Sequence, residues 1–289
     1  MASVRTAPHA AGRATKSPGE GPPPEGPPWD LPLDEAPLAF LDLEMTGLAL
    51  DRGDRVIEVC IERVRGGVVE ARLESLVDPG PGTWDTRSGD VHGIAVATLA
   101  CAPPFSSIAR AVIEILDGAV PVAHAAEWDL AFLHAELERV GLAGPTHALD
   151  TLVLSRRAFF QPSYALAALA RAFAIDPGTA HRAGDDVRTL RGVYAHVVKE
   201  LSPSTPRDLW MVRIGENEPR PGVVAACQEA VTRGTPVQVT YRPASSGPKE
   251  FGMVMTAVDG PHVHGFMVPS RGRRTLLLAR VLRVEPLPP

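Results

Sequence analysis

The sequence predicts an α/β domain built on a mixed sheet, followed by a smaller β-rich domain. Three neighbouring strand patterns open the first domain, and helical and strand patterns alternate after them. Locally paired strands followed by alternating helices and strands are typical of a sheet with helices packed on it. Several further strand patterns follow one short helical pattern in residues 222–289, so we expect a separate barrel-like unit there.

The three opening strands are expected at LAFLDLEM, RVIEVCIERV and VVEARLESLV. The first, residues 38–45, begins as an apolar run suited to a buried strand. Gly66 and Gly67 separate the second strand from the third and predict a hairpin turn. A short buried strand is expected at VPVAH, residues 120–124, and helices are expected at residues 105–117, 127–140, 164–173 and 185–201.

Composition divides the chain into four segments. Residues 1–36 are rich in Pro, Gly and Ala, and such a composition buries too little apolar surface to offset ordering, so we expect disorder there. The α/β domain is expected at residues 37–201, a linker containing SPSTPRD at residues 202–221, and the small β-rich domain at residues 222–289.

Charge is distributed unevenly between the two parts of the chain. Residues 1–204 hold 18 Lys+Arg and 27 Asp+Glu, a balance of −9, whereas residues 205–289 hold 11 and 7, a balance of +4. The three cysteines form no CxxC pair, so neither a zinc knuckle nor a disulfide framework is indicated. No apolar run reaches membrane-spanning length and no secretory signal is evident, so we expect a cytoplasmic protein without a membrane partner.

Four acids occupy positions where strands end and helices begin. Asp42 and Glu44 are two residues apart on a strand and therefore share a face. Like charges repel and lose hydration on burial, so this arrangement makes sense if a cation lies between them. Asp129 lies in the first turn of the helix after VPVAH, and Asp186 begins the last helix of the domain, five residues after His181. Such ends converge at one edge of an α/β sheet.

This set of side chains suits phosphodiester hydrolysis. All-oxygen ligands favour hard cations such as Mg²⁺ or Mn²⁺, and two such ions roughly 3.5–4 Å apart can clamp the attacking and leaving oxygens. His181 could take the proton of the attacking water. Taken singly, each residue has a simpler interpretation: a solvent-facing strand edge for Asp42 and Glu44, a helix-start acid for Asp129, and a structural role for His181.

The order of the motifs resembles that of the DEDD superfamily of 3′–5′ exonucleases, in its histidine-containing branch. The motifs are LDLEMTGL, VAHAAEWDLAFL and HRAGDDVRTL, with DVHGI and LDTL between them. Within this branch the chain most resembles the proofreading epsilon subunits of bacterial replicative DNA polymerase. The resemblance runs from about Leu38 to Leu201.

The resemblance implies a ribonuclease-H-like mixed sheet flanked by helices, and it assigns roles to particular residues. The implied ligands of two Mg²⁺ or Mn²⁺ ions are Asp42, Glu44, Asp129 and Asp186, and the implied general base is His181. Asp185 is the rival for the last ligand. Substrate contacts are implied for Met45, Thr46, His92 and Trp128. In the second motif, Ala125 replaces the usual Asn, which removes a hydrogen-bonding side chain near the site. Trp128 replaces the usual Phe and keeps an aromatic plane.

The function expected from these motifs is metal-dependent 3′–5′ hydrolysis of single-stranded or frayed DNA ends, with release of nucleoside monophosphates in proofreading or repair. Two alternatives remain open. One is RNA trimming, because oligoribonuclease shares the LEMTGL segment. The other is an inactive module that docks on nucleic acid or on a polymerase, although an intact set of acids argues against it. A DNA polymerase is a candidate partner.

The C-terminal domain has a weaker resemblance. The segments VVAACQEAVTRGTPVQVTYRP and RRTLLLARVLRVEP resemble parts of a WYL domain, a small Sm- or SH3-like β-barrel, although the Trp-Tyr-Leu step is not evident. The arginines of SRGRRT, residues 270–275, could meet phosphates. A solvated loop without a partner is the alternative.

Overall fold

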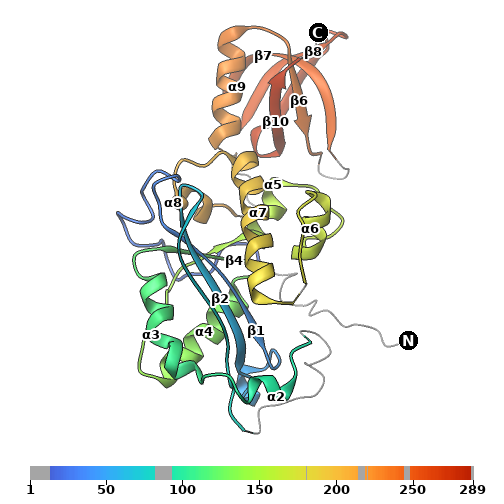
Figure 1. The fold of residues 1–289 in the computed structure, drawn as a ribbon. Helices are drawn as coiled ribbons and strands as arrows, with labels where there is room; N and C mark the ends of the chain where they lie inside the picture. Colours follow the sequence, from blue (N-terminus) through green and yellow to red (C-terminus); the bar gives the residue numbers. More distant parts are fainter. Residues whose placement is uncertain are drawn as a thin grey trace, which may run out of the picture. The chain divides into compact units, whose positions relative to one another are not determined.

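The computed structural model describes residues 14–81, 93–179, 181–213, 219, 221–243 and 248–287 (Figure 1). The chain divides into two compact units. Unit 1 comprises Met1–Ser155, Ser163–His196 and Ser204–Val212, and unit 2 comprises Arg156–Pro162, Val197–Pro203 and Arg213–Pro289. The larger of the two carries all the predicted site residues.

A five-stranded mixed sheet forms the centre of unit 1, in the order β3-β2-β1-β4-β5. The first three strands are antiparallel neighbours, whereas β4 runs parallel to β1 and β5 runs parallel to β4. This arrangement confirms the predicted ribonuclease-H-like mixed sheet. The strands are β1 (Leu38–Met45), β2 (Val56–Arg65), β3 (Val68–Leu76), β4 (Val120–Ala123) and β5 (Leu149–Asp150).

Helices cover both faces of this sheet (Figure 1). Leu41 of β1 belongs to a buried cluster with Val112 of α3 and Leu133 of α4. The neighbouring residue Phe40 points to the opposite face, where its ring meets Tyr194 of α7 edge-on at 5.2 Å. The helices that begin in unit 1 are α2 (Val96–Leu99), α3 (Phe105–Leu116), α4 (Glu127–Arg139), α5 (Thr151–Ala158), α6 (Leu166–Ala172), α7 (Ala183–Leu201) and α8 (Pro206–Trp210), with a 3₁₀ turn, η1, at Leu50–Arg52.

Part of the segment that we expected to be disordered is packed instead. Residues 1–13 lie outside the described residues, but within residues 14–36 Trp29 is only 5% exposed. The Oγ of Ser17 accepts a hydrogen bond from the backbone N of Asp150 at 3.0 Å. Composition missed this segment because one large apolar ring and a few hydrogen bonds hold it, and neither depends on its average character.

The start of the predicted linker also differs from the expectation. Residues 204–212 belong to unit 1 and contain α8, which begins with a capping box between Thr205 and Asp208. Trp210 is 4% exposed, and its Nε1 donates to the carbonyl of Pro18 at 3.4 Å. The two segments expected to be irregular therefore pack against each other.

Unit 2 contains a five-stranded antiparallel sheet, in the order β10-β6-β7-β8-β9, and one helix, α9. The helix packs Cys227 against Met253, Met255 and other buried residues of the sheet. This confirms the prediction of a small β-rich unit. Its elements are α9 (Pro221–Arg233), β6 (Val237–Tyr241), β7 (Lys249–Asp259), β8 (His262–Val268), β9 (Arg273–Leu277), the 3₁₀ turn η2 (Leu278–Arg280) and β10 (Val281–Pro286).

Within the described residues, no helix has the length and apolar character needed to cross a membrane.

Candidate active site

The carboxylates of β1 lie on the sheet face that α7 covers. Asp42 and Glu44 alternate with the core residues Leu41 and Leu43, so they share the face of Phe40. The backbone N of Leu43 donates to Oδ1 of Asp129 at 3.0 Å. This hydrogen bond ties the first turn of α4 to β1 and brings Asp129 next to the pair.

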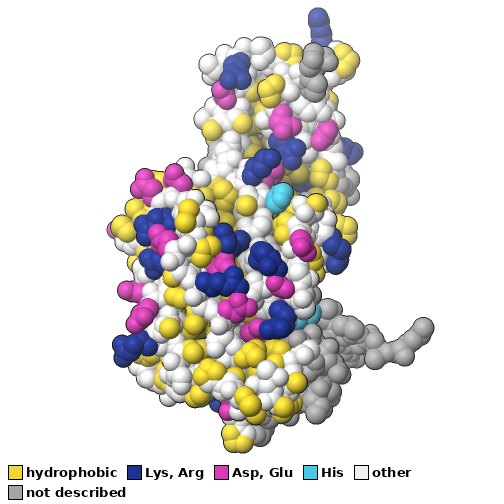
Figure 2. All heavy atoms as spheres, viewed as in Figure 1, with side chains coloured by type: hydrophobic (Ala, Val, Ile, Leu, Met, Phe, Trp, Pro, Cys, Tyr) yellow, Lys and Arg dark blue, Asp and Glu magenta, His cyan; other side chains and the backbone are white. Residues whose placement is uncertain are grey.

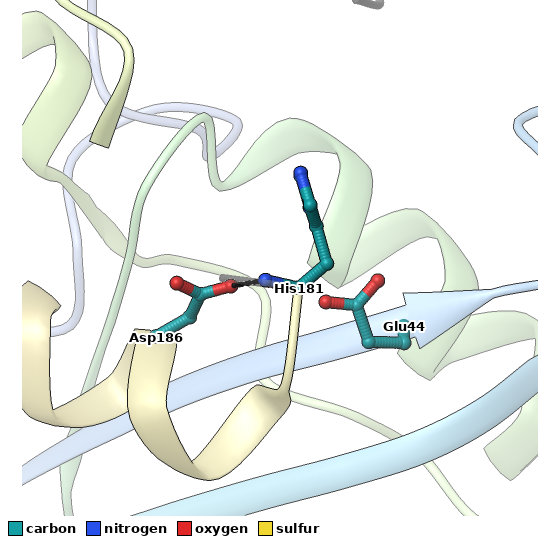
Figure 3. Close-up of side chains that lie close together, drawn as sticks. All are labelled: Glu44, His181 and Asp186. Carbon is teal, nitrogen blue, oxygen red and sulfur yellow. Dashed lines mark hydrogen bonds between the residues drawn. The ribbon is translucent and has the colours of Figure 1, made fainter. Parts of the chain in front are cut away.

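The start of α7 adds a carboxylate and a histidine. Asp186 lies in its first turn, and Oδ2 of Asp186 accepts a hydrogen bond from the backbone N of His181 at 3.0 Å. His181 has a φ of 61°, in the left-handed region, and its side chain is exposed. Glu44, His181 and Asp186 each bring one ligand atom within 4.8 Å of the others (Figure 3).

The electrostatics show that all four predicted acids form one cluster. Burial, and then the charges of Asp129, Glu44 and Asp186, raise the pKa of Asp42 well above its ordinary value. Burial followed by the charge of Asp186 raises the pKa of Glu44 to about 8. Burial is also the main cause that raises the pKa of Asp129 to about 7 and that of Asp186 to about 6. A cluster that repels its own charges is suited to hold cations.

The donor set fits a hard divalent cation. Carboxylate oxygens are the ligands that Mg²⁺ and Mn²⁺ prefer, and these four come from three different elements, β1, α4 and α7. Arg182 is the cation whose charge lowers the pKa of Glu44, but its guanidinium pairs with Glu58 of β2. The structure therefore contains a candidate metal site made of acids and one histidine.

Asp185 and Asp186 have different environments. Asp185 accepts a hydrogen bond from the backbone N of Thr179 at 2.6 Å and pairs with Arg188. These contacts, the Thr179 hydrogen bond first, lower the pKa of Asp185 below its ordinary value. Asp186 instead faces the cluster, so the geometry favours Asp186 over its rival.

The predicted substrate contacts are only partly accessible. Met45 and Trp128 are half-buried and pack against the hydrophobic core. In the sequence they adjoin two of the clustered acids, Glu44 and Asp129. Thr46 is 2% exposed, and its hydroxyl donates to Oδ1 of Asp54 at 2.9 Å and accepts from the backbone N of Arg55 at 3.1 Å. We therefore no longer expect the Thr46 side chain to contact substrate. His92 lies outside the described residues.

Ala125, which replaces the usual Asn of the second motif, occupies a special backbone position. Its φ is 60°, and its backbone N donates to Oδ1 of Asp150 at 3.0 Å. The left-handed region suits Asn better than Ala. The expected Asn thus has a conformational rationale here, in addition to any contact of its side chain.

Sequence reasoning missed Glu58, which holds the start of α7. Glu58 is 2% exposed and lies opposite Glu44 in the β1–β2 register. Its carboxylate accepts from Nη2 of Arg182 at 2.9 Å and from the backbone N of Ala183 at 3.2 Å. Glu58 therefore fixes the turn that connects His181 to Asp186.

Asp150 plays a matching part for α4 and α5. It is 1% exposed, and its Oδ1 accepts from the backbone N of Ala125 and from that of Leu152, at 3.0 and 2.8 Å. Burial raises the pKa of Asp150 to about 6. The signal for Glu58 and Asp150 was the same as for Asp42: an acid inside an apolar run, in RVIEVCI and ALDTL.

Further along β2, a second buried glutamate joins arginines from two elements. Glu62 pairs with Arg72 of β3 and with Arg191 of α7, the latter at 2.7 Å. Figure 2 shows cationic and acidic side chains alternating on the visible face of unit 1. Glu62 lies opposite Phe40 in the β1–β2 register, and its partner Arg191 follows Asp186 by five residues of α7. Glu62 therefore does not hold the turn between His181 and Asp186, which makes it a matched control for Glu58.

Glu58→Gln should lower turnover roughly 10- to 100-fold, the usual cost of losing a group that orients a metal ligand. The amide keeps the shape of the side chain but weakens its hold on Arg182 and α7. Glu62→Gln should lower the melting temperature by about as much as Glu58→Gln does, but it should leave turnover near normal. Turnover and melting temperature measured for both variants check this. Equal losses of activity would mean that general destabilisation explains the effect.

Without metal, Asp42→Asn should raise the melting temperature, by more at pH 8 than at pH 5. The folded-state pKa values of about 6, 7 and 8 for Asp186, Asp129 and Glu44 lie above the ordinary values. The folded chain therefore binds more protons than the unfolded chain between about pH 4 and pH 8, and stability falls as the pH rises through that window. Each kcal/mol recovered raises the melting temperature by about 2–4 °C.

Thermal melts in a chelator at both pH values measure this difference. A gain of equal size at pH 5 and pH 8, or a loss at pH 8, would show that the carboxylates do not repel one another.

The fold and the cluster together define a class of protein: an α/β nuclease-like domain with a carboxylate site at the edge of a mixed sheet. A family model described as Exonuclease, RNase_T, matches residues 39–194. Since that match covers more than half of the 289 residues, the chain belongs to this exonuclease family.

Three relatives illustrate the family. A DNA polymerase III subunit epsilon-like protein of Rhodobacter capsulatus is 34% identical over 132 residues, 45% of this chain and 19% of the relative. The 3′-5′ exonuclease DinG of Bacillus subtilis is 28% identical over 164 residues, 56% of this chain and 17% of the relative. A DNA polymerase III subunit epsilon of Rickettsia typhi is 30% identical over 163 residues, 54% of this chain and 71% of the relative. The chain thus spans less than a fifth of the length of the first two relatives.

Proposed function

We propose that this chain is a metal-dependent 3′–5′ exonuclease that hydrolyses phosphodiester bonds at DNA 3′ ends and releases nucleoside monophosphates. The observation that carries the proposal is the cluster of Asp42, Glu44, Asp129 and Asp186 beside His181 in an exonuclease-family domain. Relatives named as a 3′-5′ exonuclease and as polymerase epsilon subunits support the reaction and its direction.

In this proposal the four carboxylates hold two divalent cations, Mg²⁺ or Mn²⁺. When bound, such ions stabilise the charge that develops on the phosphoryl oxygens. His181 accepts the proton of the attacking water at a ring nitrogen. Its side chain is exposed and lies close to Glu44 and Asp186, so the ring can reach a water at this site. Its backbone hydrogen bond to Asp186 keeps the base next to the cluster.

Other parts of the molecule would position the substrate. Met45 and Trp128 keep part of their surface exposed beside the cluster, so they are our candidates for contact with the terminal nucleotide, together with His92. A polymerase partner is proposed from the names of the relatives, and a cytoplasmic location from the sequence. The likeness of unit 2 to a WYL domain remains a proposal.

The test uses the full chain on matched single strands of DNA and RNA, each labelled at its 5′ end, with Mg²⁺ or Mn²⁺. We expect a ladder of shortened DNA products, which a chelator abolishes. Faster loss of RNA would make the chain an RNA-trimming enzyme instead. Absence of cleavage of either strand would favour the inactive docking module.

A further inference from the structure

Unit 2 exposes an aromatic ring on the sheet face opposite its core. Val254 of β7 lies opposite Phe266 of β8, which in turn lies opposite Arg273 of β9. Directly paired residues share a face, so these three side chains form a row across three strands. Met253 and Met255 alternate with Val254 and are buried on the other face, while Phe266 is 38% exposed. We call the exposed side the β8–β9 surface.

An open hollow of about 660 Å³ forms part of this surface. That volume lies within the range of typical small-molecule sites. The hollow lies beside the β8–β9 turn, and its walls are mostly apolar and include one cation. The lining residues are Val254, Phe266, Met267, Val268, Pro269 and Arg271.

Arginines border the hollow without acidic partners. Arg271, Arg273 and Arg274 are exposed, and within the described residues their side chains form no ion pair or hydrogen bond. Arg274 pairs with Gly265 and alternates with Arg273, so it lies on the opposite face of the sheet, over the ring of Phe251 and 5.9 Å from its centroid. By contrast, Arg233 of α9 pairs with Glu229 at 2.6 Å. The two cations on the side of Phe266, Arg271 and Arg273, are therefore available to an external anion.

The ligand that matches this surface carries both negative charge and planar rings. A simple anion would leave the apolar hollow unfilled, and an apolar ligand would leave the two arginines, Arg271 and Arg273, unpaired. A single strand offers phosphates and unstacked bases together, whereas a duplex keeps its bases stacked inside. The balance of +4 in residues 205–289 favours the same polyanion.

We propose that the β8–β9 surface binds single-stranded DNA, with a base stacked on Phe266 and phosphates held by Arg271 and Arg273. This inference extends the proposed function, since the strand held by unit 2 would be the substrate cut by unit 1. Binding itself requires neither metal nor cleavage. It can therefore be tested in a chain whose hydrolysis is switched off.

The test measures fluorescence anisotropy of a labelled DNA strand of about 20 nucleotides, longer than one site of roughly 4–16 nucleotides. The full chain carries Asp42→Asn to prevent cleavage. Phe266→Ala should weaken binding roughly 5- to 150-fold, because stacking of one base is worth about 1–3 kcal/mol. Phe266→Tyr should keep near-normal affinity. The double variant Arg271→Ala, Arg273→Ala should also reduce the slope of log affinity against log salt concentration by about 1.4, or about 0.7 for each lost phosphate contact.

Arg233→Ala is the matched control, since it removes an exposed arginine of the same unit that is already paired. Affinity unchanged in both the Phe266→Ala and the double-arginine variant would overturn the proposal. So would an equal loss in Arg233→Ala, because that would indicate general electrostatics. Tight binding of RNA without DNA, or full competition by poly-glutamate, would assign the surface to another ligand. Cleavage is measured separately, in the chain that keeps Asp42. If that chain did not cleave DNA, the proposed exonuclease function would fail, but the binding result for unit 2 would stand.

Discussion

Asp42→Asn should reduce nuclease turnover by about 10³-fold or more while leaving the fold intact. Metal-assisted charge stabilisation is worth several kcal/mol, and about 4 kcal/mol corresponds to that factor. Asp42 lies at the centre of the cluster, since the charges of Asp129, Glu44 and Asp186 all raise its pKa. Release of mononucleotides from a single strand, followed over several decades of rate, measures the loss. We expect the same for Glu44→Gln, Asp129→Asn and Asp186→Asn.

Asp185→Asn is the matched control for this series. It removes a carboxylate next to Asp186 that bonds Thr179 and Arg188 outside the cluster. Its effect on turnover should be mild. An inactive Asp185 variant together with an active Asp186 variant would reverse the assignment of the last ligand.

His181→Ala should lower turnover by roughly 10²- to 10⁴-fold, the range expected for loss of a general base. Metal binding should persist, because in the proposed mechanism the four carboxylates are sufficient ligands. Two measurements separate these effects: turnover, and the rise in melting temperature on addition of Mn²⁺.

A His181→Ala variant that no longer responds to Mn²⁺ would make the histidine a ligand, which its distance to Glu44 and Asp186 also permits. The acidic limb of the activity–pH profile gives an independent readout. If that limb is the same in the variant as in the unmodified chain, His181 is not the titrating base.

Local patterns in the sequence predicted the elements that carry the cluster. β1 has the bounds expected from LAFLDLEM, and alternation along it places Asp42 and Glu44 on one face. Helical spacing found α4 and the start of α7 to within two residues. The order of the motifs then indicated that these ends meet, because strand and helix ends converge at one edge of such a sheet.

Features that depend on distant partners could not be predicted in this way. Trp29 is buried in a segment of disordered composition, and its neighbours come from α8 and from the loop before β5. The resemblance implied a substrate contact for Thr46, but the turn that follows β1 buries its hydroxyl. The role of Glu58 is visible only when Arg182, more than a hundred residues later, lies against it. The spacing of residues along the chain cannot predict such long-range contacts.

The most direct test of 3′–5′ hydrolysis uses two DNA strands that differ only in the position of one resistant phosphorothioate linkage, at the 3′ or the 5′ terminus. Both strands carry a label near the middle, and both are incubated with the full chain and Mn²⁺. We predict that the 3′ linkage slows degradation strongly, whereas the 5′ linkage leaves the initial rate unchanged. Equal rates on the two strands, or a block by the 5′ linkage alone, would contradict a 3′–5′ exonuclease.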